Sequence, residues 1–170
     1  MDALNVPRPP VGTWSVRVER NRLTFAAAHM ATFAGGCEPL HGHNYALALR
    51  VEGPLTEDAW VIDFGLLKRL GRELCDELDH KVLVQLSGAL RVTRRAASYH
   101  LGFGDREYSL PASDVFELPC DNSTAERIAE YLWARLRARL AEAPGVSHLA
   151  LLAVEVEESP GQSATYTATL

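Results

Sequence analysis

HGHNYALALRVE, residues 41–52, is the stretch that indicates the fold most clearly. From Tyr45 onward its large apolar residues occupy every second position, which is the period of a strand with one buried face. His41 and His43 begin the same face, because side chains two positions apart on an extended chain point the same way. Gly53-Pro54 ends the pattern. We therefore expect a half-buried β-strand that starts with two neighbouring histidines.

Further strands are predicted on both sides of this segment. Residues 14–29 alternate around two groups of apolar residues, which suggests two strands joined by a turn near Arg20-Asn21. Residues 60–63, WVID, favour a short strand. Residues 149–158 and 163–170 alternate again and predict a closing pair of strands.

Two segments switch to the period of a helix. Residues 64–78 place four leucines on one side, and Asp63 is a suitable N-cap. Ser123 and Glu126 form the pattern of a capping box. It opens a second helix, which should stop at Pro144-Gly145. The apolar stripe of this second helix comprises Ile128, Leu132, Leu136 and Leu140.

The order of these elements predicts one α+β domain, an antiparallel sheet with two helices packed on one face. Residues 1–13 hold three prolines and should form an extended N-terminal arm, so the domain covers residues 14–170. Residues 89–110 predict a β-hairpin that turns near Gly104-Asp105.

Composition limits the classes of function. The net charge of −5 argues against broad contact with nucleic acid or with an acidic membrane surface. No apolar run is long enough to span a bilayer, and the first residues lack the features of a signal peptide. The three cysteines are far apart and odd in number, which favours reduced thiols and a cytoplasmic protein. They are Cys37, Cys75 and Cys120.

Three histidines can meet at one end of the predicted sheet. His29 lies at the end of the apolar face of residues 14–29. His41 and His43 lie at the start of the apolar face of the next strand. If the two strands pair, the three imidazoles converge. Three imidazoles with an open fourth position are typical of a catalytic zinc site. The alternative is three separate histidines on loops near the surface.

Six segments occur in the order typical of one family. They are FAAAH (25–29), CEPLHGHNY (37–45), VIDFGLLK (61–68), LDHKVL (78–83), NSTAE (122–126) and VEVEESP (154–160). Over roughly residues 14–170 the chain resembles 6-pyruvoyl-tetrahydropterin synthases and 6-carboxy-tetrahydropterin synthases of deazaguanine (queuosine) biosynthesis. The resemblance implies a tunnelling fold, a homo-hexamer built from two trimers, active sites at subunit interfaces, and a reduced pterin as substrate.

Carried over by residue, the resemblance places the Zn²⁺ ligands on His29, His41 and His43. It places a catalytic thiol on Cys37 and its proton-transfer partners on Asp79-His80. A thiol beside a cation is easily deprotonated, and an imidazole held by a carboxylate moves protons near neutral pH. The alternatives are a small buried cysteine, and a histidine that meets the dipole at a helix end.

Two further residues are implied to bind the pterin ring. Glu158 continues the apolar face of its strand, where a carboxylate needs a partner such as the two N–H groups of a pterin. The alternative is a solvated residue after the strand's end, since Ser159-Pro160 follows. Thr124 resembles a position that lines the pterin pocket, or it is simply a residue in the first turn of a helix.

Two departures from the family concern the substrate. Glu38 follows Cys37 directly, and family members with both residues look bifunctional, also cleaving the side chain of dihydroneopterin. The alternative is a surface glutamate. Residues 84–118, which include the hairpin, are an insertion relative to short members, so the rim of the pocket should differ.

The resulting hypothesis is a zinc-dependent lyase that converts 7,8-dihydroneopterin triphosphate to 6-carboxy-5,6,7,8-tetrahydropterin. One alternative is cleavage of dihydroneopterin to 6-hydroxymethyl-dihydropterin for folate, in which Glu38 takes part. Another is a family member that binds zinc or pterin without catalysis. The presence of Cys37, Asp79-His80 and Glu158 argues against the latter.

Overall fold

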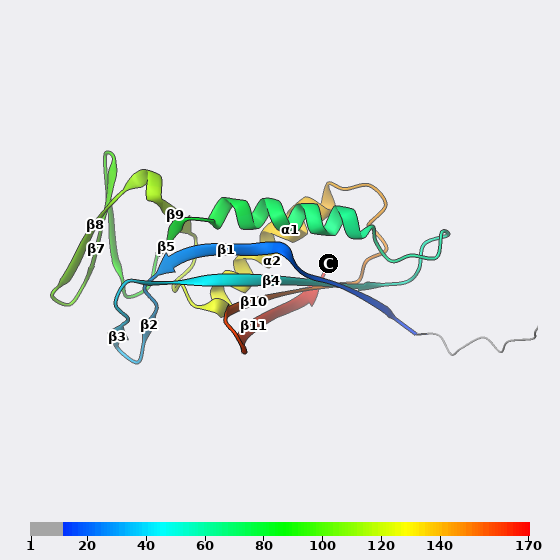
Figure 1. Ribbon diagram of the computed structural model, residues 1–170, viewed down its shortest axis with the longest axis horizontal. Coiled ribbons are helices and arrows are strands. Elements are labelled where there is room, and N and C mark those ends of the chain that lie inside the picture. The colour runs from blue at the N-terminus through cyan, green and yellow to red at the C-terminus, as the bar shows by residue number, and fades with distance from the viewer. Residues whose placement is uncertain (1–11) are drawn as a thin grey trace, which may run out of the picture.

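A six-stranded sheet forms the body of the protein, and both helices cover one of its faces (Figure 1). The structure is a computed structural model that describes residues 12–170, apart from the side chains of residues 20–22. Nearly all of the arm expected for residues 1–13 therefore lies outside the described residues. The strands of the sheet are β1 (Trp14–His29), β4 (His41–Gly53), β5 (Lys81–Gln85), β9 (Val115–Leu118), β10 (Leu151–Ser159) and β11 (Gln162–Thr169).

Hydrogen bonding orders these strands as β11-β10-β4-β1-β5-β9. The first four pair in antiparallel fashion, as predicted. β5 and β9 extend the sheet in parallel, so the complete sheet is mixed. Both are short, and neither was predicted from the sequence. The α+β class with helices on one face is confirmed.

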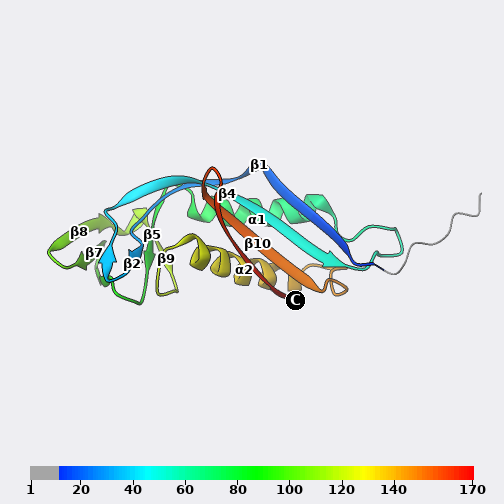
Figure 2. The ribbon, with the colours of Figure 1, turned by 90° about the horizontal axis from the view of Figure 1, so that it is seen from below.

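The predicted alternation in β4 is confirmed, because Tyr45, Leu47, Leu49 and Val51 are each at most 1% exposed. They face the leucine stripe of α1 (Phe64–Leu78) and the apolar stripe of α2 (Ala125–Ala141) in one core. Figure 2 shows the two helices lying alongside each other behind the sheet. This core supports the strand ends at which the histidines lie.

β1 differs from the prediction of two strands and a turn. It is one strand of 16 residues, and a β-bulge lies between Glu19 and Thr24. The predicted turn near Arg20-Asn21 is wrong because β4 is long enough to pair with both halves of β1, from Trp14↔Gly53 to His29↔His41. A bulge lets a strand absorb extra residues without leaving its partner.

The short strand predicted for residues 60–63 is also wrong. Val61 and Ile62 are buried in the main core, but the segment is irregular. It is held by a bond from the Thr56 amide to the Trp60 carbonyl and by His148, which donates to the Val61 carbonyl. The apolar residues of this segment therefore indicated its burial correctly, but among residues 12–170 it pairs with no strand.

The two helices begin differently. The Asp63 carboxylate caps α1, accepting from the amides of Gly65 at 2.8 Å and Leu66 at 3.2 Å. The predicted capping box of α2 is wrong: the N-cap is Thr124, whose side chain makes no capping bond. Ser123 lies one position before the N-cap, where its hydroxyl is buried without a hydrogen-bond partner and its carbonyl bonds to His29.

We expect Asp63→Ala to lower the free energy of unfolding by about 1 kcal/mol, because two amides at the start of α1 lose their acceptor. Thr124→Ala is the matched control at the N-cap of α2, and should cost less because no capping bond is lost. Denaturant titration of both variants measures the difference. Equal losses in the two variants would contradict the capping role.

Residues 91–111 form a second, three-stranded sheet at one end of the molecule, next to a small ribbon of β2 and β3 (Figure 1). The predicted turn at Gly104-Asp105 joins its last two strands, but the segment predicted as a two-stranded hairpin, residues 89–110, contains three strands. Its apolar side covers a second small core that includes Cys37. The elements are β6 (Arg91–Arg95), β7 (Ser98–Phe103), β8 (Arg106–Pro111), β2 (Thr32–Phe33), β3 (Gly36–Cys37) and the 3-10 turn η1 (Ala112–Asp114).

Candidate functional site

The three predicted histidines converge, as expected. His29 is paired with His41 across β1 and β4, and His43 follows two positions further on the same face. One ring nitrogen from each lies within 4.8 Å of the others. The cluster continues the buried face of the sheet, so the main core fixes the position of the strands that carry it.

The hydrogen bonds of the rings orient their lone pairs. Nδ1 of His29 lies 2.6 Å from the Ser123 carbonyl, and Nδ1 of His41 lies 2.8 Å from the Pro39 carbonyl. A carbonyl only accepts, so each Nδ1 carries the proton and each Nε2 presents a lone pair. Nε2 of His29 and of His43 are buried without a hydrogen-bond partner. Such an arrangement fits a cation.

Glu158 faces the same cluster from β10. Its Oε1 lies 3.3 Å from Nε2 of His29 and 3.9 Å from Nε2 of His43. It also accepts a hydrogen bond of 3.4 Å from the Tyr45 hydroxyl. A carboxylate beside two lone pairs is unfavourable without a positive charge, and burial lowers the pKa of His29 and so opposes its protonation. The strand includes Glu158, so the alternative of a residue beyond its end is wrong.

Cys37 and Glu38 are neighbours in the sequence, but Cys37 is buried and Glu38 is exposed. Cys37 is buried and its thiol donates to the Glu38 carbonyl at 3.4 Å. Burial raises the pKa of this thiol, and the nearby Arg106 guanidinium lowers it. Glu38 is exposed, and its carboxylate lies 3.9 Å from Nε2 of His41. Gly36 and Cys37 form β3, which pairs with β2.

Asp79 and His80 form a hydrogen-bonded pair at the end of α1. One oxygen of Asp79 accepts from the Ala26 amide at 2.7 Å, and the other lies 2.9 Å from Nδ1 of His80. The Ala26 bond is the main reason why the pKa of Asp79 is lowered. The side chain of His80 is 84% exposed, and it lines a hollow of about 490 Å³ together with His43.

Thr124 is the N-cap of α2 and directly follows Ser123, whose carbonyl bonds to His29. It lines a different hollow, of about 630 Å³, whose wall also includes Thr32, Asn122 and Tyr166. The structure therefore brings Glu158 and Glu38 to the histidine cluster and leaves Thr124 in a neighbouring depression.

Several residues that support the cluster were missed. Tyr45 was predicted only as a core residue, and Ser123 only as a helix cap. Asn122 holds the backbone of Thr32 through two bonds, of 2.9 and 2.8 Å, and so ties β2 to the segment before α2. The NSTAE segment contained the signal for Asn122, but a bond across 90 positions is not visible in a single sequence.

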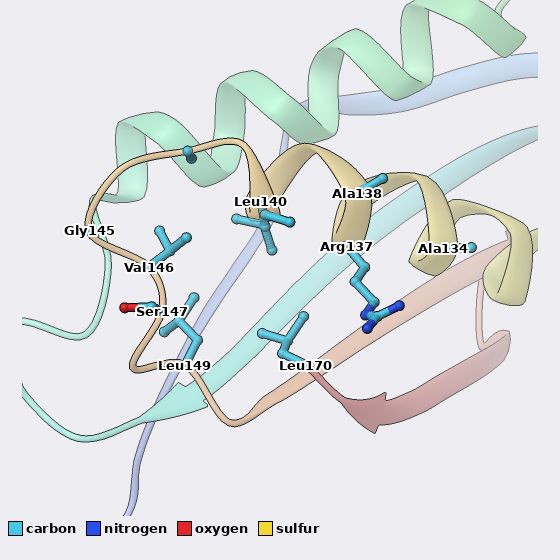
Figure 3. A pocket seen from close by; sticks show the side chains of 11 residues that line it. Ala134, Arg137, Ala138, Leu140, Gly145, Val146, Ser147, Leu149 and Leu170 are labelled. Atoms are coloured by element: carbon cyan, nitrogen blue, oxygen red, sulfur yellow. The ribbon is translucent and has the colours of Figure 1, made fainter.

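A further hollow lies between the second half of α2, the loop that follows this helix, and Leu170 (Figure 3). Its volume is about 530 Å³, and Leu140, Leu149 and Leu170 face it together with the side chain of Arg137. None of the candidate site residues lines it.

The sequence profile described as 6-pyruvoyl tetrahydropterin synthase matches residues 18–169, which is nearly the whole described domain. The chain therefore belongs to the 6-pyruvoyl tetrahydropterin synthase family, whose members are lyases, as the fold and the resemblance of its motifs indicated.

Individual relatives agree with this assignment. A Methanocaldococcus jannaschii protein, provisionally named as a 6-carboxy-5,6,7,8-tetrahydropterin synthase, is 32% identical over 85% of this chain and 89% of its own. The Rickettsia bellii 6-carboxy-5,6,7,8-tetrahydropterin synthase is 30% identical over 71% of this chain and 80% of its own.

Among solved structures, the Plasmodium vivax 6-pyruvoyl tetrahydropterin synthase superposes with a TM-score of 0.88 at 32% identity, covering 94% of this chain and all of its own. Two variants of that protein replace a glutamate, described as a catalytic residue, with alanine or cysteine. Within residues 12–170 of the present chain, neither helix has the length and apolar character needed to cross a bilayer.

Proposed function

We propose that the protein is a zinc-dependent lyase that shortens the side chain of a reduced pterin. The observation that carries the proposal is the convergence of His29, His41 and His43 on one point, with Nε2 of His29 and His43 buried and unpartnered. The donor set is the three-imidazole type that leaves a coordination position for a substrate.

In this proposal the three imidazoles hold Zn²⁺ through Nε2, because Nδ1 of His29 and of His41 is occupied by a backbone carbonyl. A bound Zn²⁺ polarises oxygen atoms of the substrate side chain. The carbonyls of Ser123 and Pro39 keep two of the rings in the required tautomer and orientation.

The remaining groups bind the ring and move protons. Glu158 accepts two N–H groups of the pterin and thereby fixes the ring beside the histidines. Asp79 holds Nδ1 of His80, so Nε2 of the exposed imidazole is available to take or give a proton. Cys37 is the second proton-transfer group. Thr124 is assigned to the rim of the pocket.

The proposed reaction converts 7,8-dihydroneopterin triphosphate to 6-carboxy-5,6,7,8-tetrahydropterin, with loss of the triphosphate and a two-carbon aldehyde. Support comes from the names of the relatives and from the simultaneous presence of Cys37, Asp79-His80 and Glu158. This product belongs to the deazaguanine (queuosine) route. The three free cysteines support a cytoplasmic location.

A second candidate is cleavage of dihydroneopterin to 6-hydroxymethyl-dihydropterin. The specific observation is that the Glu38 carboxylate lies 3.9 Å from Nε2 of His41, whereas the Cys37 side chain is buried in the second small core. A carboxylate at that place is a suitable general base for a substrate held by the histidines. The Plasmodium vivax relative, with its catalytic glutamate, supports this candidate.

The test is incubation of the zinc-loaded protein with dihydroneopterin triphosphate and, separately, with dihydroneopterin, followed by identification of products by mass. We expect 6-carboxytetrahydropterin from the first substrate. Tight binding of a pterin without any product would support a binding protein that has lost catalysis and contradict the proposal.

We also propose a homo-hexamer built from two trimers, with active sites between subunits. The outer edge of β11 belongs to the sheet's last strand, and sheet edges need covering. The exposed pair of Asp79 and His80 is consistent with a site completed by another subunit. Light scattering at micromolar concentration should give the mass of a hexamer, or of a trimer. A monomer would contradict the proposal.

A further inference from the structure

Arg106 links the β6–β8 sheet to the ribbon that carries Cys37. It is the first residue of β8, directly after the turn at Gly104-Asp105. Its Nη2 donates a hydrogen bond of 2.7 Å to the carbonyl oxygen of Cys37. The contact therefore fixes the backbone at the residue whose side chain is the proposed proton-transfer thiol.

The surroundings of Cys37 oppose the loss of its proton. The sulfur belongs to an apolar cluster with Met30, Tyr99 and Leu101, and a thiolate is poorly solvated in such a place. The S–H group also donates to the Glu38 carbonyl, a bond that only the protonated form can make. Burial and the Glu38 carboxylate both raise the pKa of the thiol.

Among the described residues that act on the thiol, Arg106 is the cation. The titratable groups that β7 and β8 contribute to the same cluster are Tyr99 and Tyr108, and the Tyr99 hydroxyl is engaged with Glu117. The guanidinium is permanently charged, so it offsets part of the effect of burial at any working pH.

We propose that Arg106 is a positioning residue for Cys37, which holds the carbonyl next to the thiol and places a fixed positive charge close to the sulfur. The part played by this thiol in catalysis rests on the proposed function. The effect of the Arg106 charge on the ionisation of the thiol does not depend on the proposed function, and it can be measured without substrate or zinc.

A purely structural role predicts a different result. The β6–β8 sheet is already attached through its apolar side, by Leu101, Tyr99 and their neighbours. If Arg106 served only to dock this sheet, removing its charge would change stability and leave the ionisation of Cys37 unchanged. Arg95, an exposed arginine of the same sheet on β6, provides a matched control for charge.

The experiment follows the ultraviolet absorption of the thiolate against pH in the metal-free protein. Subtracting the same protein with Cys37→Ser isolates this one sulfur from Cys75 and Cys120. We expect R106Q to raise the midpoint by about one pH unit, which is roughly tenfold less thiolate at a fixed pH below the midpoint. R106K keeps the charge and should stay near the parent, and R95Q should match the parent.

A midpoint in R106Q equal to that of the parent would overturn the proposal, as would R106K shifting as far as R106Q. If R106Q does not fold, R106M removes the charge while keeping an apolar stem, and the same rise is expected. A shifted midpoint in a protein that transforms no pterin would refute the proposed function and leave this inference intact. If the parent protein transforms the pterin and R106Q leaves the midpoint unshifted, this inference is refuted and the proposed function stands.

Discussion

His41→Ala should reduce the zinc content from about one ion per chain to nearly none, because the two remaining imidazoles hold Zn²⁺ much more weakly than three. His43→Ala should have the same effect. Elemental analysis after dialysis against a weak chelator measures the loss. The pterin reaction should disappear with the metal.

His100→Ala is the matched control, since His100 lies in the β6–β8 sheet and bonds to Ser98 instead of to the histidine cluster. It should keep its zinc. The His41 variant should still fold, because the main core is built from the sheet and both helices without a metal. Full zinc occupancy in both the His41 and the His43 variant would exclude the site.

The parts of the fold that follow a local period could be predicted from the sequence. The alternation from Tyr45 to Val51 predicted β4, and the leucine stripe of residues 64–78 predicted α1, the helix that packs on it. The histidine cluster was predictable for the same reason: His29 and His41 mark the ends of apolar faces on strands that proved to be partners.

The parts that depend on distant partners could not be predicted in this way. β5 is a strand because it pairs with β1, and β9 because it pairs with β5, and neither has a clear alternation of its own. The residues before α2 matched a capping box, but the N-cap is Thr124, and the hydroxyl of Ser123 is buried without a hydrogen-bond partner. For β5 and β9, long-range hydrogen bonds outweighed the local preference.

Within the site, residue types were easier to predict than directions. The sequence placed Cys37 and Glu38 together but did not show which of them approaches the histidines. Cys37 is the last residue of β3 and is buried, whereas Glu38 follows the strand and is exposed. Cys37 enters the small core and Glu38 extends toward His41.

This divergence leads to the prediction that separates the two pterin reactions. We expect Cys37→Ala to abolish formation of 6-carboxytetrahydropterin from dihydroneopterin triphosphate. We expect Glu38→Ala to weaken cleavage of dihydroneopterin by roughly a hundredfold or more, the usual effect of losing a general acid or base. Each variant should affect the other reaction much less, because the Cys37 side chain is buried in the second small core and Glu38 is exposed beside His41.

Steady-state rates with the two substrates, on proteins of equal zinc content, provide the measurement. Glu142→Ala, which removes an exposed carboxylate at the far end of α2, is the control for a general change in charge and should alter neither rate. A Glu38→Ala protein that cleaves dihydroneopterin as fast as the parent would rule out a working Glu38. A parent that does not cleave dihydroneopterin would do the same and leave carboxypterin synthesis as the single activity, because Cys37, Asp79-His80 and Glu158 serve that reaction without Glu38.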